Sequence, residues 1–336
     1  MINISLETHP DLYVDYKKTQ DFLYSIKEED YSYPKEVTNF HVYTEVTTPK
    51  ELLAIKSYLA TQDQEHTKLT VWSDYDILKP NCCFGHPTLE PYKDLIEFRV
   101  YDPTELAVGT PLEGLEKYLK PPDDDRHWMM SGIMRFLVLY KFGGIYYDMD
   151  MVLLRDFVPI LGQNFAYQWG SSTDFAKERR WEPDCHGPCA ALMGATKADS
   201  GYGPARYSQS CGLRSYFIES CMHQLINTEI RVRSTCFDED MLGYVYSRNP
   251  SLFTVFPSPF FNTEWLISKT DKELSTKVEN CWFSERMRSD SENLFLDSFA
   301  WHWHNSSNKN KRVMPESKFY WLDARIDHVL REKGIL

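Results

Sequence analysis

Residues 127–154 read HWMMSGIMRFLVLYKFGGIYYDMDMVLL, and this stretch decides the fold. Its first half, residues 127–141, is mostly apolar and long enough to form a largely buried helix. The pair Gly143–Gly144 follows, and glycine readily adopts the left-handed conformation that ends a helix. The final segment is apolar apart from Asp148 and Asp150. It therefore predicts a central strand that carries two acids.

Further strands and helices are indicated on either side of this stretch. Residues 40–46, 68–72 and 96–101 have the composition and alternation of strands, and residues 51–60 follow a Thr-Thr-Pro helix start. Another helix is predicted near residues 213–225. This order of elements predicts an α/β protein with a mixed, mostly parallel central sheet flanked by helices.

Composition narrows the class of partner. The 336 residues carry 37 Lys and Arg against 49 Asp and Glu, a formal charge of −12. This charge repels phosphate backbones and anionic lipid, so it argues against a nucleic-acid or membrane-surface binder. No apolar run approaches the ~20 residues of a transmembrane segment, and none is expected. The eight cysteines lack framework spacing and the chain start lacks a signal pattern, which together predict a cytoplasmic protein. An enzyme cropped from a membrane anchor stays an alternative.

Asp148 and Asp150 are the first candidates for chemistry. On an extended backbone, residues two apart project from the same face, so both carboxylates would lie together. Burying two unpartnered carboxylates costs several kcal/mol, and a bound divalent cation would offset that cost. Oxygen ligands suit Mn²⁺ or Mg²⁺. The alternative is a strand end at which both acids meet solvent or a nearby arginine.

Ser131 and Arg135 are the main polar positions of the predicted helix 127–141. They are four residues apart and therefore share one face. Because a buried arginine needs an anion, this face could lie beside the two acids and form a pocket for a sugar diphosphate. The alternative is a purely structural ion pair between Arg135 and an aspartate.

The ordered residues from Ser131 to Asp150 resemble the sugar-nucleotide signature of the DXD glycosyltransferase superfamily. That superfamily includes α-1,4-galactosyltransferases, α-1,4-N-acetylglucosaminyltransferases and fungal α-1,6-mannosyltransferases. Residues 43–46 are similar to the first-strand segment that those enzymes place against the nucleotide base. Residues 299–307 are similar to their C-terminal His-x-Trp-Asn-like segment. The resemblance implies a GT-A-like, nucleotide-sugar-binding fold.

The resemblance also suggests a division of the chain. Residues 1–36 are polar and acidic, and we expect an N-terminal extension there that packs on the main body. Residues 37–336 would form the GT-A-like domain. Within it, residues 37–154 would bind the donor and residues 155–336 would shape the acceptor site.

Individual roles follow from the resemblance, residue by residue. Asp150 would be the principal metal ligand, with Asp148 and His302 as further ligands. Asp148 would also bind the ribose or sugar of the donor, and Arg135 would hold the donor sugar or phosphate. The other expected donor contacts come from Thr44, Glu45, Val46, Ser131, Tyr147 and His304.

A downstream acidic run, Asp238–Asp240, falls where the family brings a loop to the sugar. Asp240 is our candidate there for a catalytic contact, and a solvated helix cap is the alternative. One position departs from the family pattern, because Gly132 stands where an aspartate is usual. The donor sugar therefore cannot be named from the pattern.

The resemblance implies a metal-dependent, retaining glycosyltransferase that moves a sugar from a UDP- or GDP-sugar to a glycan or glycoconjugate. Two alternatives stay open. One is a phosphohydrolase of the haloacid-dehalogenase kind, in which the first acid of Asp-x-Asp is the nucleophile. The other is a non-catalytic carbohydrate-binding protein of the transferase fold, which the glycine at position 132 leaves open. A zinc site at Cys185 and Cys189 is disfavoured because no second ligand pair follows.

Overall fold

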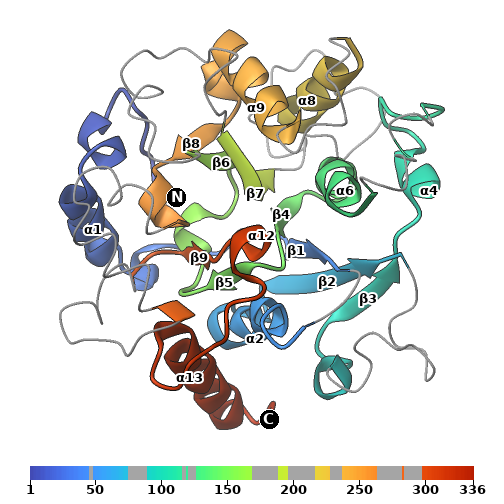
Figure 1. Ribbon diagram of the computed structural model, residues 1–336. Helices are drawn as coiled ribbons and strands as arrows, with labels where there is room; N and C mark the ends of the chain where they lie inside the picture. Colours follow the sequence, from blue (N-terminus) through green and yellow to red (C-terminus); the bar gives the residue numbers. More distant parts are fainter. Residues whose placement is uncertain are drawn as a thin grey trace.

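The computed structural model describes residues 1–44, 48–74, 89–115, 119, 126–168, 188–195, 216–227, 237–262, 282–283 and 297–336. Within these ranges, helices lie on both sides of a central sheet (Figure 1). The strands are β1 (Thr38–Tyr43), β2 (Thr67–Ser73), β3 (Glu97–Val100), β4 (Gly144–Tyr147), β5 (Met151–Leu153), β6 (Phe165–Gln168), β7 (Pro188–Ala195), β8 (Thr254–Phe256) and β9 (Ala300–His302). The helices are α1 (Tyr16–Ser25), α2 (Leu52–Thr61), α4 (Pro103–Ala107), α6 (Arg126–Phe142), α8 (Tyr216–Asn227), α9 (Phe237–Arg248), α12 (Asn305–Asn308) and α13 (Lys318–Glu332).

Seven of the described strands form the central sheet, in the order β3-β2-β1-β4-β7-β6-β8. Strands β3, β2, β1 and β4 pair in parallel, and β6 pairs in parallel with β8. Strand β7 is antiparallel to both of its neighbours. The described sheet is therefore mixed and mostly parallel, which confirms the fold class expected from the sequence.

Strand side chains alternate between two hydrophobic clusters, one on each face of the sheet. Phe40 and Val42 of β1 join the cluster that contains α2 and α13, whereas Tyr43 joins the cluster formed by α6, α8 and α9. Strand β4 divides in the same way, with Tyr147 on the α2 face and Tyr146 on the α6 face. This period of two decides which side chains can reach the site.

Most of the elements predicted from local pattern are present. The strands predicted at 40–46, 68–72 and 96–101 are β1, β2 and β3, and the helix predicted at 51–60 is α2. The helix predicted from 127 to 141 is α6, and the one predicted near 213–225 is α8. These segments are strongly apolar or periodic, so their patterns are the least ambiguous in the chain.

The single strand predicted from 145 to 154 is wrong. The chain leaves the central sheet after Tyr147, turns at Asp148–Asp150, and re-enters an extended conformation as β5. Strand β5 pairs with β9 in a separate two-stranded antiparallel sheet, with Met151 opposite His302. The Met151 N–H donates to the Asp148 carbonyl over 3.0 Å and closes the turn. The two acids therefore occupy a junction between sheets.

Two glycines make the connection from α6 to β4 possible. Gly143 has φ 64° and Gly144 has φ 88°, values that favour glycine. The Gly143 N–H donates to the Leu139 carbonyl at the end of α6. A Cβ on Gly144 would lie 2.0 Å from the carbonyl oxygen of Asn39 in β1. Only a residue without a side chain allows β4 to approach β1 this closely.

The N-terminal segment packs on the main body, as its buried positions show. The Ile2 N–H donates to the Pro159 carbonyl, and the Tyr13 hydroxyl donates to the Val255 carbonyl, both over 2.7 Å. Tyr13 is fully buried. The boundaries at residues 36 and 154 stay predictions.

Helix α13 covers the α2 side of the sheet near the C-terminus (Figure 1). Its buried Phe319, Leu322, Ile326 and Leu330 recur every three or four residues, the spacing of one helical face. Among the described residues, no helix has both the length and the apolar character needed to cross a membrane.

Candidate active site

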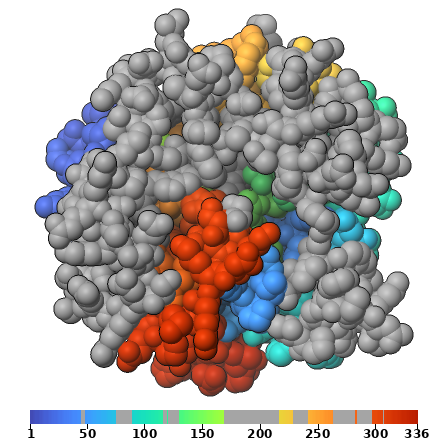
Figure 2. Space-filling view, viewed as in Figure 1, coloured from blue at the N-terminus to red at the C-terminus, as the bar shows by residue number. Residues whose placement is uncertain are grey.

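The candidate site is the turn between β4 and β5, where the central sheet meets the β5–β9 pair. Asp148 and Asp150 lie in this turn, and Met149 between them is buried. In Figure 2 the C-terminal segment, in red, lies at the front of the molecule beside blue and green parts of the chain. The turn that carries Asp148 and Asp150 contacts this segment, because Asp150 Oδ2 accepts a hydrogen bond from the Asn305 N–H.

Asp148 faces a cation and a hydroxyl from the α6 side of the sheet. Arg135 Nη2 lies 3.2 Å from Asp148 Oδ1 and 3.4 Å from Oδ2, and the Tyr146 hydroxyl donates to Oδ1 over 3.0 Å. The Arg135 guanidinium also stands 5.1 Å from the centre of the Tyr146 ring, as a cation–π contact requires. Arg135 is buried, and the side chain of Asp148 is 26% exposed.

The pKa of Asp148 is raised to about 6. Burial is the main cause because it disfavours the charged form, and the negative charge of Asp150 acts in the same direction. The nearby Arg135 opposes both effects.

Asp150 is held from the other side, by the segment that follows β9. Its Oδ2 accepts a hydrogen bond from the Asn305 N–H over 2.8 Å and lies 3.3 Å from His302 Nε2. Its carbonyl accepts from the Trp303 N–H over 3.0 Å. Burial alone would raise the pKa of Asp150, but the adjacent His302 and the Asn305 N–H outweigh it and lower the pKa below its ordinary value.

Two histidines stack beside Asp150. The rings of His302 and His304 are 3.9 Å apart between centroids, and the Tyr167 hydroxyl lies 2.9 Å from His302 Nδ1. Asn262 Nδ2 lies 2.6 Å from His304 Nε2. Burial, with a smaller effect from neighbouring His302, lowers the pKa of His304 to about 2, so this imidazole is neutral at ordinary pH.

His304 does not continue the extended conformation of β9. Strand β9 ends at His302, and His304 has φ 51°, in the left-handed region. The backbone turns there into α12, which brings the Asn305 N–H back to Asp150. The two imidazoles are still neighbours, although strand alternation is not the reason.

The other predicted donor contacts are only partly brought to this turn. Thr44 is buried at the end of β1, where its N–H donates to the Trp72 carbonyl over 2.9 Å. Ser131 lies on α6 one turn before Arg135 and is half-buried. Tyr147 points to the opposite face, with its hydroxyl 3.4 Å from the Ala54 carbonyl, because neighbouring strand residues face opposite sides.

Three predicted residues cannot be judged at the level of side chains. Glu45 and Val46 lie outside the described residues. Asp240 belongs to α9, but its side chain lies outside the described part. The zinc reading of Cys185 and Cys189 also has no described side chains to test it.

Four site residues were missed by sequence reasoning. The alternation of β4 could have selected Tyr146 in place of Tyr147, and Asn305 lies within the C-terminal segment that carried the resemblance. No local signal identifies Tyr167 or Asn262, because each reaches a histidine that is far away in sequence.

Two buried oxygen atoms, one on Asp150 and one on Asn262, show whether the residues around Asp150 suit a metal ion. Asp150 Oδ1 and Asn262 Oδ1 have no hydrogen-bond partner among the described residues. A buried carboxylate oxygen without a partner is costly unless a ligand supplies the missing charge or donor. Carboxylate and amide oxygens are ligands that Mg²⁺ and Mn²⁺ accept. The donor set around Asp150 therefore fits a divalent cation.

The described residues do not form a complete protein cage at this turn. The one described group of three with ligand atoms all within 4.8 Å of one another is Asp63, Glu65 and His66, on the loop before β2. Asp148, Asp150 and His302 are not such a group. Mg²⁺ in phosphate-handling sites commonly uses one or two carboxylates and completes its shell with substrate phosphates and water. An incomplete set of protein ligands is therefore compatible with a metal ion that is also coordinated by substrate phosphates and water.

One family model matches part of this chain. Residues 108–171 match the model of a family described as "Glycosyltransferase sugar-binding region containing DXD motif". The match includes Arg135, Asp148 and Asp150, and it confirms the resemblance that their order indicated. The matched region is thus similar to a glycosyltransferase sugar-binding region, which supports an enzymatic function of this class. Glycosyltransferases of the DXD type are generally dependent on a divalent metal.

Solved structures similar to this chain are also glycosyltransferases. The PaToxG glycosyltransferase is 12% identical, with 88% of this chain and 94% of that chain covered and a TM-score of 0.41. The glycosyltransferase GlyE of Streptococcus pneumoniae is 8% identical, with coverages of 89% and 64% and a TM-score of 0.45. The bifunctional glycosyltransferase WbbM is 11% identical, with coverages of 90% and 51% and a TM-score of 0.46. No curated protein sequence matches this one.

Proposed function

We propose that this protein is a divalent-metal-dependent glycosyltransferase whose donor site is the turn between β4 and β5. The donor would be a UDP- or GDP-sugar, and the acceptor a glycan or glycoconjugate. The observation that supports this most directly is Asp150, whose side chain is 15% exposed, with one carboxylate oxygen bound by the protein and the other buried without a partner among the described residues.

Asp150 would hold the cation, Mn²⁺ or Mg²⁺, through its Oδ1 atom. When bound, such an ion neutralises charge that develops on the departing nucleoside diphosphate. The protein contributes by holding Asp150 still, because its Oδ2 is fixed by the Asn305 N–H and its carbonyl by the Trp303 N–H. A carboxylate that is already oriented loses little freedom when a ligand binds.

Arg135 would supply a second positive charge to the donor. It is buried on α6 and lies against Asp148, so its position is set before any ligand arrives. A guanidinium can contact a phosphate and a carboxylate at the same time because it offers five N–H donors. Asp148, partly exposed, would then accept hydrogen bonds from hydroxyls of the ribose or sugar.

The sheet order supports a position for the nucleoside of the donor. Strands β1 and β4 are neighbours, while the chain continues from β1 to β2 on the other side. Such a reversal in strand order opens a crevice at the carboxyl ends of the strands, where ligands of open α/β sheets bind. Thr44 follows β1 and Asp148 follows β4. We place the base near Thr44 and the adjoining Glu45–Val46.

The proposal also includes the stereochemistry of sugar transfer. We propose retention at the anomeric carbon, as the resemblance implies. Asp148 lies against Arg135 and Asp150 against His302, and carboxylates engaged with cations or N–H donors are weak nucleophiles. This favours same-face attack assisted by the leaving phosphate over attack by either acid. Asp240 stays a candidate for contact with the sugar or acceptor.

The variant Asp150→Asn tests the proposal because it keeps the shape of the side chain and removes its charge. Wild-type protein should be stabilised by Mn²⁺ with UDP or GDP in a thermal-shift assay, by about 2.7 kcal/mol at a hundredfold excess over Kd. The variant should lose that Mn²⁺-dependent shift, and sugar transfer should fall about 10³-fold. Asp21→Asn, at an exposed position of α1, is the matched control and should retain both.

Each alternative predicts a distinct result in the same assays. Donor binding by the wild type without transfer to any glycan would favour a non-catalytic carbohydrate-binding protein. Release of phosphate from simple phosphomonoesters, lost on replacement of Asp148, would favour a phosphohydrolase. Full transfer activity in Asp150→Asn would overturn the proposal.

A further inference from the structure

Residues 305–311, here called the α12 segment, hold Asp150 although they have little packing of their own. The Asn305 N–H donates to Asp150 Oδ2 over 2.8 Å, so the position of the segment sets the orientation of the carboxylate. Helix α12 is a single turn, and none of the described side chains from 305 to 312 is buried. Since burial of apolar side chains is the main stabilising effect in folding, this segment depends on polar contacts from elsewhere.

Lys50, two residues before α2, reaches the α12 segment with its ammonium group. Its Nζ donates to the carbonyls of Asn308 over 2.8 Å, Lys309 over 3.2 Å and Lys311. Carbonyls at the end of a helix lack partners within it, so an ammonium group there supplies both hydrogen bonds and a favourable charge. The same Nζ lies 5.0 Å from the centre of the Phe283 ring. Three carbonyls account for the three donors of the lysine, which therefore serves the backbone of this segment.

Glu51 joins the same segment to the start of α2. Its Oε2 accepts from the Thr48 N–H over 2.9 Å, and the Glu51 N–H donates to Thr48 Oγ1 over 3.3 Å, the reciprocal pair of a capping box. Its other oxygen, Oε1, accepts from Asn305 Nδ2 over 3.1 Å. Asn305 is thus held by Glu51 through its side chain while its N–H holds Asp150.

We propose that Lys50 and Glu51 are positioning residues that fix the α12 segment, so that Asp150 presents its Oδ1 atom to the metal. This inference rests on the proposed function. Neither side chain touches the metal or the donor, and both act through Asn305. Partners that orient a metal ligand commonly change metal affinity 10–100-fold when they are removed, and we expect the lower end of this range.

The chain offers a matched control for Lys50. Lys50→Met keeps most of the apolar stem and removes the ammonium group. The Nζ of Lys333 donates to the carbonyls of Leu59 and Ala60, both over 2.9 Å, in the last turn of α2. Burial is the main cause that lowers the pKa of both lysines, so the two ammonium groups are shielded in a similar way. Lys333→Met therefore removes the same kind of contact at a distance from the α12 segment.

A second pair of variants separates positioning from helix capping. Glu51→Ala removes both the capping box and the contact with Asn305. Thr48→Ala, at an exposed position, weakens the capping box and leaves Glu51 Oε1 on Asn305. An effect shared by both variants would come from the start of α2, and an effect of Glu51→Ala alone would come from the α12 segment.

The first measurement is amide hydrogen exchange of the metal-free protein, read by mass spectrometry, because it reports order in the segment without any ligand. Lys50→Met should exchange about tenfold faster in a peptide covering residues 303–311. Lys333→Met should leave this peptide as it is in the wild type. Equal exchange in Lys50→Met and the wild type would overturn the inference and leave the proposed function standing.

The second measurement is Mn²⁺ affinity by isothermal titration calorimetry, with UDP and, in parallel, GDP present. Lys50→Met and Glu51→Ala should each weaken Mn²⁺ binding about tenfold, and Lys333→Met and Thr48→Ala should leave it unchanged. Wild-type affinity in both Lys50→Met and Glu51→Ala would contradict a positioning role. A wild type that binds no Mn²⁺ with either nucleotide would overturn the proposed function and this inference together.

Discussion

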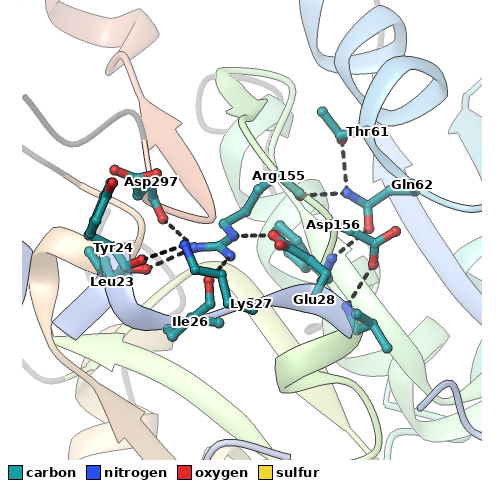
Figure 3. Close-up of polar contacts among 12 residues, drawn as sticks. Leu23, Tyr24, Ile26, Lys27, Glu28, Thr61, Gln62, Arg155, Asp156 and Asp297 are labelled. Atoms are coloured by element: carbon teal, nitrogen blue, oxygen red, sulfur yellow. Dashed lines mark hydrogen bonds and ion pairs between the residues drawn. The ribbon is translucent and has the colours of Figure 1, made fainter. Parts of the chain in front are cut away.

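Two buried polar centres of this protein, one around Arg155 and one around Asp150, are built from the same kinds of group. Arg155, just after β5, donates from Nε to Glu28 and from its terminal nitrogens to the carbonyls of Leu23, Ile26 and Asp297 (Figure 3). Its contacts join the N-terminal segment to the chain before β9.

The centre at Asp150 is incomplete by comparison. Every guanidinium nitrogen of Arg155 has an acceptor in the described protein, whereas Asp150 Oδ1 is buried and has none there. A fully satisfied buried group stabilises one conformation, and an unsatisfied one has a cost that folding alone does not explain. We infer that the first centre serves the fold, whereas the proposed function assigns the second to a ligand.

The largest expected effect on stability comes from Arg155→Met. Four acceptors would lose their donor in a region that is mostly shielded from water, so the free energy of unfolding should fall by about 3–5 kcal/mol. Denaturant unfolding measures this quantity. Sugar transfer per folded molecule should stay within a factor of about three, and a loss of about 10²-fold at full folding would break the distinction between the two centres.

Arg135→Met should show the opposite pattern. Sugar transfer, measured as kcat/KM, should fall about 10²-fold because a positioned cation is lost from the donor site, which corresponds to about 2.7 kcal/mol. The free energy of unfolding should change less than in Arg155→Met, because Asp148 is partly exposed and can take up a proton. If stability fell as much as in Arg155→Met with transfer intact, Arg135–Asp148 would be a structural ion pair.

His41 is a buried titratable group that belongs to neither centre, so its effect on stability provides a third point of comparison. Its Nε2 lies 3.2 Å from the Gly143 carbonyl, and the Trp72 Nε1–H donates to its Nδ1 over 3.3 Å. Burial, and to a smaller extent the charge of Arg99, lowers the pKa of His41 to about 4, although the Gly143 carbonyl opposes the shift. The folded protein therefore binds this proton less readily than the unfolded chain does.

The sign of the pH effect follows from that difference. Stability from neutral His41 is fully present above the unfolded pKa of about 6.5 and is lost as the pH falls toward 4. Between pH 8 and pH 5 the wild type should lose about 2 kcal/mol relative to His41→Gln. Urea unfolding of both proteins at each pH tests this, and parallel stability curves would contradict it.

Local sequence patterns predicted many of the helices and strands, but not the conformation of the turn that carries Asp148 and Asp150. The α6 helix, the glycine stop and strands β1 to β3 follow from apolar runs and periodicity, which nearby residues determine. The continuous strand across Asp148 and Asp150 was wrong because both halves are apolar, and apolarity does not reveal which sheet each half joins. The partners Tyr167 and Asn262 were missed for a related reason, since their contacts cross between distant segments.

The amino-acid sequence alone determined that two acids follow a buried helix and a glycine pair, and that this order belongs to a sugar-nucleotide region. Their order is a covalent property of the chain, and Gly144 is required wherever β4 passes so close to Asn39. Only the tertiary structure decided that Asp148 faces Arg135 while Asp150 faces His302. Those pairings depend on how β5 meets β9 and how α6 packs on β4, and packing across the chain is not encoded in any local pattern.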